Sequence, residues 1–299
     1  MTTQTVIDLS RVPAPNAIEP LDFETLLAAF KSRFLAWWEV ERERDPTLPA
    51  YDVADLETDP AIIVGQAWSY LRLLDRQRVN DAVKAVFAPL AKGADLDVIA
   101  VRQNVIRLET APGVMETDAQ LLNRSLLSFG RASAGSADRL LFDAYTAWPA
   151  MLDARVNGWA VHGRRGEIDL VIAGPGGVTP PEKMALVRSA VTSASAKPEA
   201  IGVFVLAAEI RSYAVQQALS VPVGPDAELV RLEAVARVQA AADTRRLIGA
   251  TVQRDQIAGA AFGPSILSSA HTAPPADIVC SAYQIPICSG IDTTVEVIS

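Results

Sequence analysis

Hydrophobic positions in the N-terminal third recur at the three- and four-residue spacing of an α-helix. The first such stripe follows Asp22, whose short carboxylate is a favourable helix N-cap. The second follows Asp59 and Pro60, a capping residue and the proline that is favoured at the first helical position. The pattern therefore predicts two long helices, over roughly 22–44 and 60–91.

The segment LAKGADLDVIA lies where the second helix should end and a third should begin. Glycine adopts the left-handed backbone of a helix C-terminus at little cost, so Gly93 is predicted to end the long helix. Asp95 is predicted to cap the next helix, and Asp97 to lie in its first turn, where the helix dipole favours a negative side chain. A calcium loop would need several further oxygen ligands and a late glutamate, so we interpret both aspartates as structural.

Beyond residue 112 a further helical stretch gives way to segments whose hydrophobic period is close to two. MLDARVNGWAVHG, EIDLVIAG and IGVFVLAAEIRSYAVQQALSV are strand-like, and two helices follow glycine–proline turns, starting near Thr179 and Asp226. The chain is therefore predicted to be α+β, with a helical N-terminal third followed by two small α+β modules. The predicted parts are an extended arm (1–20), a helical oligomerisation domain (21–112), a middle module (113–205) and a C-terminal module (206–299).

Composition and charge narrow the class of protein. The 299 residues are 50% hydrophobic and 21% charged, which is typical of a globular chain. The net charge of −8 disfavours nucleic acid or an anionic membrane as the main partner. We see neither a secretory signal nor a segment suited to membrane insertion, and expect synthesis in the cytoplasm. Because the mean hydropathy is nevertheless positive, at +0.20, we expect apolar surface to be buried between subunits.

No residue pattern predicts a catalytic, metal or cofactor site. His162 and His271 are more than 100 positions apart and show no zinc-binding spacing. Cys280 and Cys288 do not form a Cys-x-x-Cys motif, so we expect free thiols, with a hairpin disulfide as the alternative. The glycine-rich AGPGGVTPPE lacks the Lys-Ser/Thr of a phosphate loop, and GRASAGS does not fit G-x-S-x-G. The sequence therefore predicts a protein that is not an enzyme.

Candidate residues for structure and assembly lie on the predicted helices. Trp37 continues the apolar stripe of the first helix and is expected in a helix–helix core, whereas Trp38 points about 100° away. Trp38 is either a partly covered neighbour of that core or an interface anchor, because tryptophan is enriched among hot-spot residues. The full set of candidates is Phe30, Phe34, Trp37, Trp38, Leu71, Leu74, Gly93, Asp95 and Asp97.

Several segments resemble, in order, the baseplate J-like family of contractile-tail bacteriophages. LDFETLLAAFKSRF is similar to the family's Leu-Asp-Phe-Glu opening. RQRVNDAVKAVFAPLAKGADLD is similar to its Arg-x-Arg-Val-Asn-x-Ala segment ending in Gly-Ala-Asp-Leu-Asp, and SAGSADRLLFDA resembles its Ala-Gly-Ser before a helix. The likeness covers nearly the full length. It departs at Ser133, where the family often has threonine, and at KPEAIGVFVLAAE, which replaces an Arg-Pro-Leu-Thr-type approach.

The resemblance implies a structural part of the baseplate wedge, in the virion after assembly in the host cytoplasm. It implies two copies per wedge with one tail protein I-like partner, and six wedges around the hub and spike. A lysozyme-related wedge protein would link this ring to the sheath, tail fibres could attach to it, and its rearrangement would release sheath contraction.

Two alternatives stay open beside that role. One is the equivalent part of a tailocin or contractile injection system. The other is a tail-tip hydrolase using Asp95 and Asp97, although residues two apart on a helix do not face each other. A DNA-binding connector is disfavoured by the negative charge.

Overall fold

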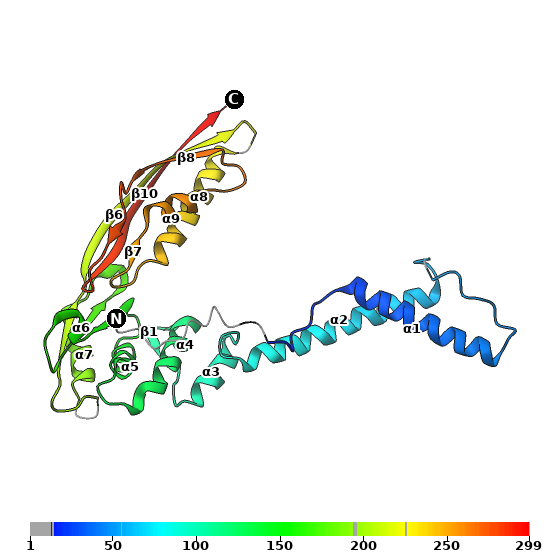
Figure 1. Cartoon of the computed structure of the whole chain (residues 1–299), viewed down its shortest axis with the longest axis horizontal. Helices are drawn as coiled ribbons and strands as arrows, with labels where there is room; N and C mark the ends of the chain where they lie inside the picture. Colours follow the sequence, from blue (N-terminus) through cyan, green and yellow to red (C-terminus); the bar gives the residue numbers. More distant parts are fainter. Residues whose placement is uncertain (1–12, 14, 55, 194–195, 225, 299) are drawn as a thin grey trace. The chain divides into compact units, whose positions relative to one another are not determined.

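The chain divides into two compact units in the computed structural model, drawn as ribbons in Figure 1. The structure describes residues 13, 15–54, 56–193, 196–224 and 226–298, so most of the predicted arm lies outside the described residues. One unit ends at Ile99, and the other holds the residues from Ala100 onwards. A helical N-terminal region is followed by strand-containing modules, which confirms the predicted α+β class.

The two long helices begin where their capping residues predict. In α1 (Phe23–Arg44), the Asp22 carboxylate accepts a hydrogen bond from the backbone N–H of Glu24 at 3.0 Å. In α2 (Pro60–Val86), the Asp59 carboxylate accepts one from Ala61 at 2.9 Å. The second helix ends five residues before the predicted residue 91. Pro89 accounts for this, because the residue before a proline is disfavoured in helical conformation and the proline has no N–H to donate.

The first unit is held together by close packing of α1 on α2. Phe30 of α1 faces Gly65 of α2, where a Cβ atom would lie only 2.4 Å from the phenyl ring. The same ring packs on Trp68, with ring centroids 5.7 Å apart. Leu26, Leu27 and Ile62 are buried. The absence of a side chain at Gly65 therefore sets how closely the two helices approach.

A short helix, α3 (Ala94–Val101), leads to a small hairpin and then to the middle module. The hairpin consists of β1 (Glu109–Ala111) and β2 (Val114–Met115). The elements that follow are α4 (Asp118–Leu127), η2 (Ser128–Ala132), α5 (Ala137–Ala147), β3 (Asp153–Asn157), α6 (Trp159–His162), β4 (Glu167–Ala173), η3 (Pro175–Gly177), α7 (Pro181–Val191) and β5 (Gly202–Ala207).

The sheet of the middle module has the order β3-β4-β5. Strand β4 runs antiparallel to β3 and parallel to β5, and α7 forms the crossover that a parallel pair requires. Helices α5 and α7 pack against each other, α5 also contacting β3 and α7 contacting β5 (Figure 1). The buried core residues here include Leu140, Leu141, Leu170, Ile172, Val187 and Val191.

The C-terminal module is a second sheet covered by helices. Its elements are β6 (Glu209–Pro222), α8 (Ala227–Asp243), β7 (Thr251–Val252), α9 (Arg254–Ala260), β8 (Ser268–Ala273), β9 (Ile278–Val279) and β10 (Gln284–Ile298). The sheet order is β10-β6-β8, with β10 parallel to β6 and β8 antiparallel to it. Alternate residues of β6, among them Val215 and Leu219, are buried in one cluster with Val230, Val238 and Ile257.

Three local expectations for these modules need correction. The strand after Met151 ends at Asn157, because the following residues form the helical turn α6. The long strand predicted from residue 201 is two strands, since the chain passes from one sheet to the other at Ala208. Helix α7 begins at Pro181, two residues after Thr179, near which its start was predicted, and the Thr179 hydroxyl donates to the Ile172 carbonyl at 3.1 Å.

Candidate functional site

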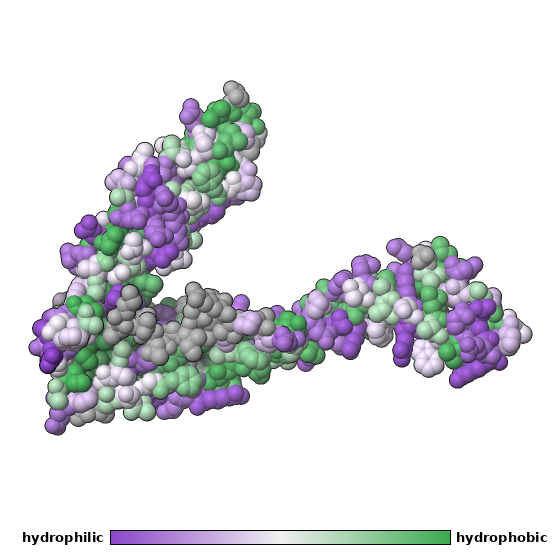
Figure 2. Space-filling view, in the orientation of Figure 1, coloured by the Kyte–Doolittle hydropathy of each residue, from purple (hydrophilic) through white to green (hydrophobic). Residues whose placement is uncertain are grey.

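A row of exposed apolar side chains lies along α2, on the side opposite its buried residues. We call this row the outer stripe, and it consists of Ile63, Ala67, Tyr70, Leu71 and Leu74. At about 100° per residue these positions share one face of the helix. Leu71 is 61% exposed and Leu74 is 42% exposed. Figure 2 shows hydrophobic patches among hydrophilic residues on this unit. A helix that packs on its own chain with one side and exposes an apolar row on the other is suited to pack on two neighbours.

Phe30 and Phe34, both predicted candidates, lie together in an aromatic cluster between α1, α2 and the loop that joins them. Their stacked rings have centroids 6.3 Å apart. Phe34 also packs edge-on against Tyr51 of the loop at 4.8 Å. Such aromatic contacts stabilise beyond the area that they bury. These two residues therefore hold the helix pair together within one chain.

Of the adjacent tryptophans, Trp38 is the partly covered neighbour that was one of its two predicted alternatives, whereas Trp37 does not lie in the helix–helix core as predicted. Trp38 is half-buried, its indole N–H donates to the Pro49 carbonyl at 3.0 Å, and its ring packs on Tyr51. Trp37 is 54% exposed, with the guanidinium of Arg33 over its ring at 6.0 Å. The loop after α1 folds back on the side of Trp38, which helical spacing alone does not reveal. Trp37 is consequently the tryptophan that this chain leaves open to a partner.

Gly93 has the left-handed backbone that was predicted for it, with φ of +54°, but the neighbouring assignments change. Helix α2 has already ended, so Gly93 directly precedes α3 and does not terminate the long helix. Since α3 begins at Ala94, Asp95 is not its N-cap and lies with Asp97 in the first turn. Both carboxylates still lie at the positive end of the helix dipole, which stabilises their negative charge.

Sequence reasoning missed a polar clamp on α2. The side chain of Asn80, which is 4% exposed, accepts from the Glu19 N–H at 2.9 Å and donates to the Glu19 carbonyl at 2.7 Å. Arg76, one helical turn earlier, pairs with the Glu19 carboxylate at 2.8 Å. The chain before α1 is thereby fixed on α2. The signal lay in RQRVNDA, whose Arg76 and Asn80 share one helix face.

The structure brings no chemical site together at the other predicted positions. Cys280 and Cys288 are both free thiols in the structure. In the part of the chain that the structure describes, no cluster of three or more histidine, cysteine or acidic side chains is arranged to hold a metal ion. No helix among the described residues combines the length and apolar character needed to span a membrane.

Comparison with known proteins finds a match to a known domain in the region that carries the outer stripe. Residues 57–113 match the baseplate J-like N-terminal domain. Over 295 residues the chain is 29% identical to baseplate protein J of Escherichia phage P2, covering 95% of this chain and 96% of that relative. The chain is similar to baseplate J-like proteins over nearly its full length. This similarity supports a structural component of a phage baseplate.

The matched domain contains most of the features described above. It includes all of α2 with the outer stripe and Asn80, then Gly93, α3 and the first strand of the hairpin. The identity extends well beyond it, through both α+β modules.

Proposed function

We propose that this protein is a wedge component of a contractile-tail baseplate, and that its N-terminal helices join it to a second copy of itself and to a tail protein I-like partner. The observation that supports this most is the outer stripe, an exposed apolar row within the domain that matches the family. Residues at three- and four-residue spacing are the anchors with which one helix packs on another.

A second copy is the first occupant that we propose for this surface. In a two-fold contact the same surface is used twice, so a row of apolar side chains along a straight helix can complement itself. The charges beside the row have both signs, with Arg72, Asp75 and Arg78 following one another along α2, and no like-charge repulsion dominates. Exposed Trp37 on α1 gives a further aromatic anchor for the partner chain.

The remaining assembly follows from the same proposal. Six wedges surround the hub and spike, a lysozyme-related wedge protein connects them to the sheath, and tail fibres attach at the rim. The middle and C-terminal modules, predicted from the sequence as 113–205 and 206–299, link one wedge to the next. Rearrangement of this ring releases contraction of the sheath.

The test is to co-express the chain with its tail protein I-like neighbour and to measure the molar mass by light scattering. We expect a complex of two copies with one partner chain. The double variant Leu71→Asp with Leu74→Asp should reduce this complex to free chains, because it places two charges in a desolvated interface. The matched control is Val79→Asp, at a position of α2 that is 57% exposed but points away from the outer stripe. A wild-type chain that stays monomeric with the partner present would refute the proposal.

A further inference from the structure

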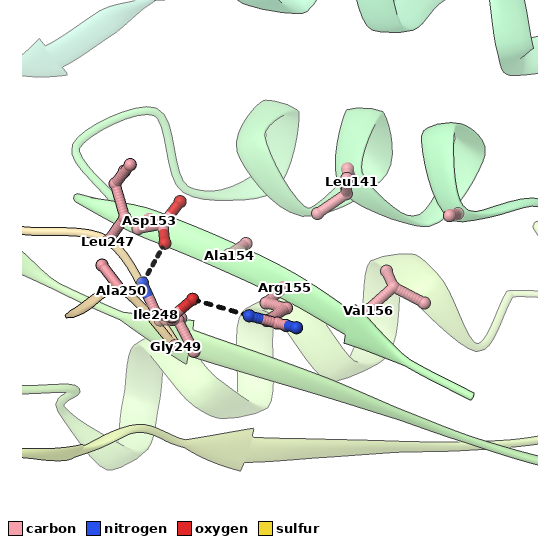
Figure 3. A pocket seen from close by; sticks show the side chains of 10 residues that line it. Leu141, Asp153, Ala154, Arg155, Val156, Leu247, Ile248, Gly249 and Ala250 are labelled. Carbon is pink, nitrogen blue, oxygen red and sulfur yellow. Dashed lines mark hydrogen bonds between the residues drawn. The ribbon is translucent and has the colours of Figure 1, made fainter. Parts of the chain in front are cut away.

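Side chains of strand β3 form hydrogen bonds with backbone groups in two segments of the C-terminal module. The Asp153 carboxylate accepts from the Ile248 N–H at 2.6 Å, and the Arg155 guanidinium donates to the Ile248 carbonyl at 3.1 Å (Figure 3). Asn157 donates from its amide to the Ala282 carbonyl at 2.9 Å. These three residues alternate along the strand and so project from one face of it. We call them the latch residues.

A second set of polar contacts joins the same two modules. The Tyr283 hydroxyl donates to the Asp169 carboxylate at 2.7 Å, and Arg164 pairs with the same carboxylate at 2.6 Å. Burial raises the pKa of Asp169, but the hydrogen bonds from Tyr283 and Arg164 outweigh it and the pKa is lowered overall. Asp169 therefore stays ionised and continues to bind the tyrosine of the C-terminal module.

The apolar part of this junction is small. Five buried residues form it, namely Val171, Ala173, Ala208, Ile248 and Ile285. A cavity of about 270 Å³ lies beside it, lined by residues of α5, β3 and the segment Leu247–Ala250 (Figure 3). By contrast, the core inside the C-terminal module contains twelve buried residues. Small, polar contacts between parts of a chain are the kind that permit relative motion.

The chain itself crosses between the modules at one residue. Ala208 separates β5 from β6, its N–H donates to the Ile172 carbonyl at 2.8 Å, and the next N–H, of Glu209, donates to the Tyr283 carbonyl at 2.9 Å. A short connection of this kind leaves the orientation of the C-terminal module to the contacts around it. Buried polar networks are suited to that task, because they are satisfied in one geometry and costly to leave half-made.

We propose that the latch residues fix the C-terminal module in one orientation on the middle module, and that their release frees the C-terminal module when the baseplate is triggered. The second clause rests on the proposed function, whereas the first concerns the isolated chain. The latch residues bind backbone groups of Ile248 and Ala282. The latch therefore depends on where the backbone of the C-terminal module lies, and not on which side chains that module carries.

Gly249 offers a way to open the latch without altering a latch residue. Its φ is +79°, and a Cβ atom there would lie 2.1 Å from a guanidinium nitrogen of Arg155. Gly249→Ala should therefore displace that guanidinium. Gly163→Ala is the matched control, because Gly163 has φ of +73° with no atom within 4 Å of a built Cβ. Both variants carry similar backbone strain, but only the first disturbs the latch.

Hydrogen–deuterium exchange on the full chain measures the result. In Gly249→Ala we expect about tenfold faster exchange in residues 247–250 and 281–284 than in Gly163→Ala, the effect of losing one or two hydrogen bonds. Exchange in the buried parts of β6 and α8 should be the same in both. Equal exchange in the two variants would overturn the proposal, and so would an increase that extends equally through β6 and α8.

A milder variant keeps the test informative if Gly249→Ala fails to fold. Arg155→Lys retains the charge but loses the planar group that reaches both Ile248 and Asn157. It should speed exchange in residues 247–250, whereas Arg188→Lys, at an exposed position of α7, should not. The same exchange in both lysine variants would contradict the latch.

The release clause is tested in assembled particles. We expect Gly249→Ala particles to contract at a lower temperature than Gly163→Ala particles, scored as the fraction of contracted tails by electron microscopy. Identical contraction curves would overturn the release clause. Absence of the wild-type chain from purified baseplates would instead refute the proposed function, and the exchange result on the isolated chain would stand apart from it.

Discussion

Helices α2 and α8 bury different sets of residues against their own chain. The buried positions of α2 are Ile62, Gly65, Ser69 and Asn80, so one large apolar side chain is fully covered in a helix of 27 residues. Helix α8 buries Val230, Ala234, Val238 and Ala242, a regular row at four-residue spacing that lies against the C-terminal sheet. Two leucines of α8 stay exposed, whereas α2 exposes its whole outer stripe.

The two regions therefore differ in what stabilises them, which is burial within the chain for the C-terminal module and, in the proposed assembly, contact with partner chains for the N-terminal helices. The C-terminal module buries its apolar residues within one chain, and burial of this kind is the dominant favourable contribution to folding. The N-terminal helices bury little and keep apolar surface available. Their stability in a baseplate would therefore depend on partner chains by mass action, while that of the C-terminal module would not.

The largest expected difference is between the losses of stability when two leucines, one buried and one exposed, are replaced by alanine. Leu219→Ala removes a fully buried side chain from the C-terminal core, which should cost about 2–5 kcal/mol. Leu71→Ala, on the outer stripe, should change the stability of the isolated chain by less than about 0.5 kcal/mol. Opening free energies from hydrogen exchange, measured for β6 and α2 respectively, give both values. Equal losses would show that α2 depends on its own chain as much as the C-terminal core does.

The second prediction concerns the junction of the middle and C-terminal modules, through the pH dependence of stability. Burial raises the pKa of Asp153 from 3.8 to about 6, against the opposing hydrogen bonds from the backbone N–H groups of Ile248 and Ala154. The folded state therefore binds a proton on the Asp153 carboxylate more tightly than the unfolded state does. The contribution to stability is present at low pH and is lost as the pH rises from about 4 to about 6.

A shift of this size corresponds to at most about 3 kcal/mol. Asp153→Asn keeps an oxygen acceptor for the Ile248 N–H but does not titrate, so its stability should not show this loss. The measurement is the difference in unfolding free energy between wild type and variant from pH 4 to pH 7. If the wild type became more stable than the variant as the pH rose, the direction assigned to Asp153 would be wrong.

The third prediction returns to the N-terminal helices. Gly65→Ala places a methyl group within 2.4 Å of the Phe30 ring, and separating α1 from α2 should cost about 1–3 kcal/mol. In Gly259→Ala of α9 the added methyl group meets no atom within 4 Å, and higher helix propensity should stabilise that helix by up to about 1 kcal/mol. Thermal melting followed by circular dichroism distinguishes the two signs. A lower melting temperature for Gly65→Ala and a higher one for Gly259→Ala would confirm that close packing of α1 on α2 requires glycine at position 65.

Features set by neighbours in the sequence could be predicted, and those set by distant segments could not. Asp22, Asp59 and Asp226 each cap a helix through backbone groups two and three residues away, and the sequence predicts a helix start at all three. Pro89 was equally local, yet its effect on α2 was overlooked. The latch joins residues 95 and 125 positions apart, through backbone groups that carry no sequence signal.

The smallest expected effect tests the two neighbouring tryptophans, of which helical spacing placed Trp37 in the helix–helix core. Trp38→Phe keeps an aromatic ring beside Tyr51 but removes the indole N–H that donates to the Pro49 carbonyl, which should cost about 1 kcal/mol. Trp37→Phe loses no hydrogen bond that the structure shows for this exposed ring, and should leave the isolated chain unchanged within about 0.5 kcal/mol. Chemical denaturation of both variants measures these changes. In the complex with the partner chains the order should invert, because Trp37 is the ring left open for contact, and an unchanged order would place the interface away from it.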